Sequence, residues 1–158
     1  MDFWTLNHEA TFKDIKDFNY ANQKLAVVIH IQNDEGKILL QQRGEKSNGD
    51  RGLYEDIGGK LEEYDATFKD AIKRELEEEV GRDIKLNISD SIGIFRSFKD
   101  NVNWIFIVYF GQYLSGEFKI MEKEKCLGYK FFTYEELMNC NLVSDSCKFL
   151  TKSIKYYK

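Results

Sequence analysis

The chain of 158 residues has no proline, only two histidines and only three cysteines. The histidines are isolated and no Cys-x-x-Cys pair occurs, so no zinc site of the usual spacing is supported. Three cysteines without paired spacing are typical of reduced thiols. No apolar run approaches ~18 residues, and the first residues lack the basic and apolar regions of a signal peptide. We therefore expect a cytoplasmic protein without membrane contact.

Long basic runs are also lacking, and the formal net charge is -4. Proteins that bind DNA or RNA need many positive charges to meet the phosphates. A nucleic-acid polymer is therefore not an expected partner, whereas a small charged ligand held through metal ions suits an acidic protein. The sequence carries no signal for the oligomeric state, and a homodimer stays open.

The order of the apolar segments predicts a mixed sheet covered by helices. The runs "KLAVVIHIQ" (24–32) and "KILLQQR" (37–43) are typical of two strands that form a hairpin. Residues 67–80 predict a helix with one apolar face, which Gly81 ends. Further strands are predicted at 84–98, 103–114 and 128–134, and further helices at 134–138 and 145–157.

This order indicates the α/β (α+β) class, with an α/β/α sandwich in a single domain over residues 1–158. Residues 1–23 precede the first predicted strand and combine polar residues with scattered aromatics. We expect this N-terminal extension to cap the core, and a partner contact is the alternative.

Three carboxylates are crowded into the last turns of the predicted helix. Glu75, Glu78 and Glu79 are related by three and four residues, so their side chains point to one side and repel each other. The helix dipole opposes negative charge at this end by ~0.3–1 kcal/mol per exposed charge. A solvated acidic face is the ordinary alternative. Hard divalent cations prefer carboxylate oxygens, however, so we interpret the cluster as a site for Mg²⁺ or Mn²⁺.

A Gly58-Gly59-Lys60 turn lies ahead of this helix. It is not a phosphate-binding P-loop, because Tyr54 stands where that motif needs glycine and Leu61 where it needs serine or threonine. Two glycines still leave the backbone open to close approach, and a lysine is a suitable point charge for a phosphate.

The segment "GGKLEEYDATFKDAIKRELEEEVG" resembles the Nudix box of the Nudix (MutT-like) hydrolases. That signature is Gly, five residues, Glu, seven residues, Arg-Glu, an aliphatic, any residue, Glu-Glu, any residue, Gly and an aliphatic. With Gly59 as its start, the box spans 59–82 and its second half matches residues 74–81 one by one.

The first half of the box departs from the pattern. Asp65 stands where glutamate is expected, and eight residues rather than seven separate it from Arg74. Tyr64 replaces a common glycine, and Arg82 stands where an aliphatic residue is usual. The loop ahead of the helix is therefore rebuilt by one residue.

The resemblance covers roughly residues 24–156 and implies a divalent-metal-dependent hydrolysis of a nucleoside diphosphate linked to another moiety. The segment "EKEKCLGYKFFTYEEL" (122–137) is closest to the nucleoside triphosphate diphosphatase branch, which releases a monophosphate and diphosphate. An ADP-ribose or nucleotide-sugar pyrophosphatase and a non-catalytic nucleotide sensor are the alternatives. An isopentenyl diphosphate isomerase shares the box but needs Cys and His groups that the two histidines do not match.

The resemblance also implies roles for single residues. Glu78 and Glu79 are expected metal ligands, and Glu75 a ligand or base. Arg74 is expected to orient a glutamate through a bidentate pair. The further expected metal ligands are the Gly58 carbonyl and Glu124, with Glu122 as the alternative. The expected substrate contacts are Arg43, Lys60 and Glu55.

Overall fold

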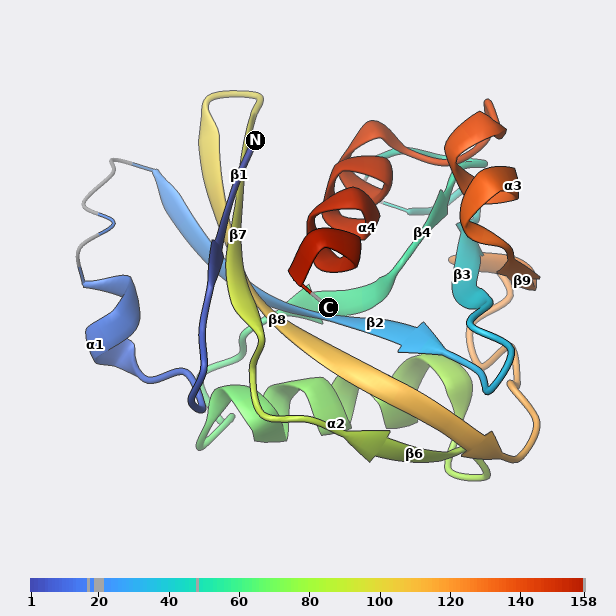
Figure 1. Cartoon of the computed structure of the whole chain (residues 1–158), viewed down its shortest axis with the longest axis horizontal. Coiled ribbons are helices and arrows are strands. Elements are labelled where there is room, and N and C mark those ends of the chain that lie inside the picture. The colour runs from blue at the N-terminus through green and yellow to red at the C-terminus, as the bar shows by residue number, and fades with distance from the viewer. Residues whose placement is uncertain (17, 19–21, 48, 158) are drawn as a thin grey trace.

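The structure is a computed structural model that describes residues 1–16, 18, 22–47 and 49–157, without the side chains of 156 and 157. Within these residues, nine strands form one mixed sheet that lies between helices (Figure 1). The strands are β1 (Asp2–Thr5), β2 (Gln23–Gln32), β3 (Ile38–Arg43), β4 (Tyr54–Glu55), β5 (Ile57–Lys60), β6 (Lys85–Ile88), β7 (Gly93–Lys99), β8 (Val102–Ser115) and β9 (Cys126–Phe132). The helices are α1 (Phe12–Ile15), α2 (Phe68–Val80), α3 (Tyr134–Asn139) and α4 (Asp145–Tyr157).

Strands β2 and β8 run side by side and parallel through the middle of the sheet, whereas the other pairs of named strands are antiparallel. The main path is β1-β7-β8-β2-β3-β4, with β5 on β2, β6 on β8 and β9 on β3. Helix α2 lies on one face and α4 on the other (Figure 1). The predicted α/β/α architecture is therefore confirmed. None of the helices described is long and apolar enough to cross a membrane.

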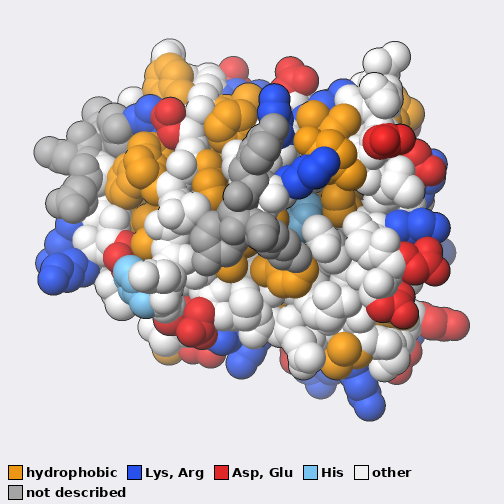
Figure 2. Space-filling view, viewed as in Figure 1, with side chains coloured by type: hydrophobic (Ala, Val, Ile, Leu, Met, Phe, Trp, Pro, Cys, Tyr) orange, Lys and Arg blue, Asp and Glu red, His pale blue; other side chains and the backbone are white. Residues whose placement is uncertain are grey.

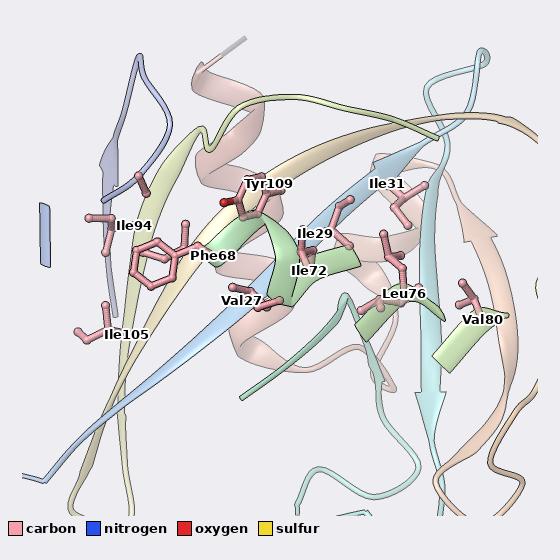
Figure 3. Close-up of a cluster of buried hydrophobic side chains, with 14 of the residues drawn as sticks. Val27, Ile29, Ile31, Phe68, Ile72, Leu76, Val80, Ile94, Ile105 and Tyr109 are labelled. Carbon is pink, nitrogen blue, oxygen red and sulfur yellow. The ribbon is translucent and has the colours of Figure 1, made fainter. Parts of the chain in front are cut away.

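The side chains of β2 alternate between the two faces, because successive residues of a strand point in opposite directions. Val27 and Ile29 are buried against Ile72 of α2 in the larger core cluster (Figure 3). Val28 points the other way and joins Leu150 of α4 in a second cluster. The α4 face therefore carries the even-numbered residues of β2, and the cleft described below opens on that face.

Helix α2 confirms the predicted helix closely. The Thr67 hydroxyl caps its start by accepting a hydrogen bond of 3.0 Å from the Asp70 amide. Gly81 ends it with a φ of 86°, a backbone conformation that favours glycine. The apolar stripe of the helix faces the sheet, so the acidic residues of its last turns lie along the edge of that contact.

The prediction of one strand over 84–98 is wrong. Strands β6 and β7 replace it, and residues 89–92 form an irregular segment between them, in which only Ser89 and Ile92 are seen to donate backbone hydrogen bonds to β8. The Ser91 amide donates instead to the Glu9 carboxylate, at 3.0 Å. This contact joins residues 82 positions apart, so the local apolar pattern gave no sign of the break.

The predicted hairpin of 24–32 and 37–43 is only partly formed. Strands β2 and β3 pair through Ile31↔Leu39 and Gln32↔Ile38 alone. Further along, β2 pairs with β5 and β3 with β9, so the two strands diverge. The cleft lies in the region where they have separated.

The N-terminal extension is built into the fold. Strand β1 adds to the sheet beside β7, and Ala10 and Ile15 are buried in the α2-side core. Glu9 accepts hydrogen bonds from the Ser91 amide and the Tyr109 hydroxyl. Positions 17 and 19–21 of the extension lie outside the described residues.

Candidate active site

A cleft of about 990 Å³ opens over the α4 face of the sheet and reaches the acidic turns of α2. Figure 2 shows that charged and hydrophobic side chains alternate in small patches on the face drawn there. The cleft is in the size range of small-molecule sites. All of the predicted site residues except Glu124 line this cleft. They are Arg43, Glu55, Gly58, Lys60, Arg74, Glu75, Glu78 and Glu79.

The carboxylate of Glu75 lies directly against the backbone of Gly59. A Cβ atom at position 59 would lie 2.3 Å from the Glu75 carboxylate carbon and from one of its oxygens. Only glycine leaves room for this approach. The Gly-Gly turn therefore fixes where Glu75 can sit on the cleft wall.

Arg74 is the centre of an ion-pair network on the wall of the cleft. Its Nε and Nη2 atoms donate to the two oxygens of Asp65, both at 2.9 Å. Its Nη1 donates to Glu75 at 2.9 Å and to Glu78 at 3.2 Å, and its Nη2 also donates to the Lys60 carbonyl at 3.0 Å. The predicted bidentate partner was a glutamate, and the structure corrects it to Asp65. The shorter side chain reaches Arg74 despite the extra residue between them.

Electrostatics set Glu79 apart from Glu75 on α2. Burial, together with the charge of the neighbouring Glu75, raises the pKa of Glu79 to about 8. Burial also raises the pKa of Glu75, although Arg74 opposes this. One oxygen of Glu79, Oε2, is buried and has no hydrogen-bond partner among the described residues. A buried polar atom without a partner is costly, and it is an observation that a ligand would explain.

A second ion pair lies across the cleft from Lys60. Arg43 donates to Glu55 at 3.2 Å and to the Gly49 carbonyl at 2.8 Å. Burial raises the pKa of Glu55 to about 8, and a hydrogen bond with Asp50 contributes to the rise. The predicted phosphate contact Arg43 is therefore present in the cleft, with its charge partly met by Glu55.

The structure favours Glu122 over Glu124 as the acidic residue from outside α2. Glu122 lines the cleft and raises the pKa of Glu79 through its charge. The Glu124 side chain is 67% exposed and pairs with Lys46 at 3.0 Å. The expectation for Glu124 is thus not supported by its position.

Several polar side chains of the cleft were not among the predicted site residues. Gln41 of β3 forms a hydrogen bond with Glu79, and its place on a strand that ends at Arg43 was the available signal. Asp56 accepts from the Cys147 thiol at 3.4 Å and lies 3.1 Å from a ring nitrogen of buried His30. These contacts of Asp56 connect α4 to β2 and fix the start of β5.

The donor chemistry fits a divalent cation, but the donors do not yet converge. Among the described residues, no three His, Cys, Asp or Glu side chains are arranged as a ready metal site. Arg74 holds Glu75 and Glu78 toward itself, while the free oxygen of Glu79 is the atom best suited to a cation. The Glu78 side chain is 49% exposed, so it can turn from Arg74 to a cation at little cost.

The sequence model of the NUDIX domain matches residues 22–152. The chain belongs to the Nudix family. The predicted family is therefore confirmed, and the chain is a Nudix-type pyrophosphohydrolase, an enzyme that hydrolyses acid anhydrides of phosphorus. A comparison with curated proteins finds no match.

Solved Nudix structures share this fold. The MutT protein of Methanosarcina mazei Go1 is 22% identical with a TM-score of 0.73, and the match covers 87% of this chain and 96% of that one. The NUDIX domain of Shewanella oneidensis NrtR, complexed with ADP ribose, is 17% identical with a TM-score of 0.65, and the match covers 94% and 100%. A possible asymmetric diadenosine tetraphosphate hydrolase of Jonesia denitrificans is 15% identical with a TM-score of 0.67, and the match covers 85% and 94%.

Proposed function

We propose that this Nudix enzyme hydrolyses a nucleoside triphosphate to a monophosphate and diphosphate, with Mg²⁺ or Mn²⁺ as cofactor. The observation that carries the proposal is the buried Oε2 oxygen of Glu79, which has no hydrogen-bond partner in the part of the chain that the structure describes and lies in the same cleft as Lys60 and Arg43. Such a cleft offers negative groups for a cation and positive groups for phosphates at the same time.

The residues that would hold the cation are Glu75, Glu78 and Glu79, with the Gly58 carbonyl and Glu122 as further oxygen donors. A divalent ion bound there would neutralise the diphosphate and lower the pKa of a water molecule. Burial also raises the pKa of Glu75, and we assign this carboxylate the role of the base that takes the proton of the attacking water.

Two cations of the chain would act on the phosphates. Lys60 lies on the strand end beside the carboxylates, and Arg43 lies on β3 across the cleft. Charge grows on the phosphoryl oxygens during attack, and fixed positive groups stabilise it. Arg74 is occupied by Asp65 and its neighbouring glutamates, so we assign it the role of orienting carboxylates.

A second candidate substrate is ADP-ribose, which is bound by the similar domain from Shewanella oneidensis. A nucleotide sensor is the third reading. A sensor would be free to lose the three carboxylates of α2, and this chain has kept them.

The test is a release assay with nucleoside triphosphates, ADP-ribose and nucleotide sugars, each with Mg²⁺, Mn²⁺ or a chelator. We expect metal-dependent release of diphosphate from a triphosphate. Glu78→Gln and Glu79→Gln are expected to abolish turnover, with Glu77→Gln as the matched control, because Glu77 directly precedes them in sequence and is exposed.

Turnover that survives both substitutions would contradict the assigned metal role. Turnover of ADP-ribose alone would replace the triphosphate with the second candidate. Binding of metal and nucleotide without turnover of any of these compounds would favour the sensor.

A further inference from the structure

A small side chain, that of Ala26, lies on the floor of the cleft beside Lys60. Ala26 of β2 pairs with Phe106 of β8 on one side and with Lys60 of β5 on the other. Residues directly opposite on neighbouring strands share a face of the sheet. A methyl group therefore lies between an aromatic ring and a lysine, and all three residues line the cleft.

Trp104 extends this floor toward the end of the sheet. Its ring stacks on Phe106, with centroids 5.9 Å apart and planes inclined by 24°. The Nζ atoms of Lys24 and Lys60 lie 5.4 and 5.7 Å from the Trp104 ring centroid. The tryptophan is thus held in one orientation at the edge of a positively charged zone.

Tyr64 stands on the wall of the same cleft, in the loop between β5 and α2. Its side chain is among the most exposed large hydrophobic groups, with the residue 71% exposed. The Arg74 guanidinium lies 5.4 Å from its ring centroid. Because Asp65 and the Lys60 carbonyl fix Arg74, the tyrosine packs on a rigid support rather than on a mobile side chain.

Both rings are connected to Lys60. The Lys60 ammonium group faces the Trp104 ring. The Lys60 carbonyl accepts a hydrogen bond from the Arg74 guanidinium, which packs on the Tyr64 ring. A base joined through its ribose to a phosphate at Lys60 would therefore find aromatic surface in the same cleft, on the sheet and on the loop. Bases stack on such side chains whatever their sequence identity, because every base has a π face.

We propose that Trp104 and Tyr64 bind the base of the substrate, so that this enzyme requires a nucleotide rather than a sugar, lipid or inorganic diphosphate. The inference rests on the proposed function, since Lys60 is taken there as a phosphate contact. It adds two specificity-determining residues, one of which stands on the rebuilt loop ahead of α2.

The first experiment uses tryptophan fluorescence. The chain has two tryptophans, so Trp4→Phe leaves Trp104 as the only one. The probes are adenosine and guanosine monophosphates, which contain no diphosphate to cleave, and inorganic pyrophosphate with ribose 5-phosphate as base-free controls. We expect the nucleotides to quench Trp104 and the base-free compounds to leave it unchanged, and Tyr64→Ala to weaken the nucleotide titration roughly tenfold.

The second experiment separates base binding from phosphate binding. Tyr64→Ala and Trp104→Phe are expected to raise KM for nucleotides, roughly tenfold for the alanine variant, and to leave inhibition by pyrophosphate unchanged. Tyr64→Phe should retain the KM of the natural protein. The matched control is Phe98→Ala, because Phe98 is 62% exposed and does not line the cleft.

Equal quenching by pyrophosphate, or equal loss of pyrophosphate inhibition in the variants, would overturn the proposal. Nucleotide quenching without turnover of any substrate would leave the base site standing and refute the proposed hydrolysis. Turnover of a nucleotide without a change in Trp104 fluorescence, and without an effect of the Tyr64 and Trp104 variants, would support the proposed hydrolysis and refute the base site. Tyr64 is exposed, so its variants test the site without a risk to folding.

Discussion

Asp65 meets Arg74 in a bidentate ion pair, with both N–O distances at 2.9 Å. The side chain of Asp65 is 3% exposed and that of Arg74 is 16% exposed. The guanidinium in turn holds Glu75 and Glu78, so this pair positions two carboxylates of the candidate metal site.

Asp65→Asn is expected to reduce activity by about 10- to 100-fold, as for other partners that orient metal-binding groups. Breaking the pair leaves Arg74 partly unpaired, so we expect unfolding to become easier by about 1–3 kcal/mol. Urea denaturation and the release assay measure the two effects. Arg82→Lys is the control, because Arg82 is 86% exposed and its pair with Glu77 has no role in the cleft. An Asp65→Asn enzyme with full activity would refute the positioning role.

The same pair predicts a pH dependence. The hydrogen bonds from Arg74 hold the pKa of Asp65 below its usual value. The pair therefore stabilises the fold above the unfolded-state pKa of about 3.9 and loses this contribution as the pH falls through the lower folded-state value. The stability difference between the natural protein and Asp65→Asn should shrink from pH 7 to about pH 2.5. If urea denaturation shows the same stability difference at every pH, the cost of Asp65→Asn comes from packing and not from the ion pair.

Gly59→Ala is expected to inactivate the enzyme by about 100-fold or more, because a Cβ there displaces the Glu75 carboxylate. Gly36→Ala is the matched control. Gly36 has a φ of 76° and open space around its Cβ position, so alanine should cost about 1–2 kcal/mol of stability and leave kcat unchanged. Parallel measurements of Tm and kcat separate the two. Normal kcat in Gly59→Ala would show that Glu75 is not held by this contact.

Removal of the Glu79 charge should have opposite effects on activity and on the stability of the metal-free protein. The folded-state pKa of about 8 lies above the unfolded value of about 4.3. Protonation therefore stabilises the fold, fully below about pH 4, and this contribution is lost as the pH rises through about 8. In chelator, the natural protein should lose stability between pH 5 and pH 8.5, and Glu79→Gln should lose less.

Magnesium is expected to restore stability to the natural protein at pH 8.5 and to leave Glu79→Gln unaffected, because a bound cation compensates the buried charge. Thermal unfolding with and without Mg²⁺ measures this. Equal stabilisation of both proteins would place the cation away from Glu79.

Glu122→Gln is expected to lower kcat, whereas Glu124→Gln should leave it unchanged. Glu122 lines the cleft, and Glu124 makes an exposed pair with Lys46 that contributes at most about 1 kcal/mol to stability. The two substitutions are identical in chemistry and two residues apart, so each controls the other. A loss of activity in Glu124→Gln but not in Glu122→Gln would instead support Glu124 as the metal ligand.

Local signals in the sequence were sufficient for part of this molecule. The spacing of apolar residues along 68–80 and the glycine after them define α2, because a helix forms from neighbours in the chain. The carboxylates on that helix follow directly from the same spacing. Strand β1 gave no comparable signal, since its partner β7 lies about ninety residues away.

The same limit applies within the cleft. That Glu122 rather than Glu124 faces the carboxylates depends on how residues 116–125 turn, and neither residue carries a signal for it. The pair of Asp65 with Arg74 could be expected from charge alone, but the extra residue obscured which acid reaches the guanidinium. Trp104 and Tyr64 line the same cleft only because of the sheet register and the loop that precedes α2.

The alternation along β2 has a consequence for how this enzyme can change. Val27 and Ile29 hold α2 in place, while Val28 between them and Ala26 before them line the cleft on the other face. Neighbouring residues of β2 therefore determine independent properties. One set holds the helix on the sheet, and the other shapes the surface that a ligand contacts. Substrate preference can drift at alternate positions of one strand while the fold beneath it stays constant.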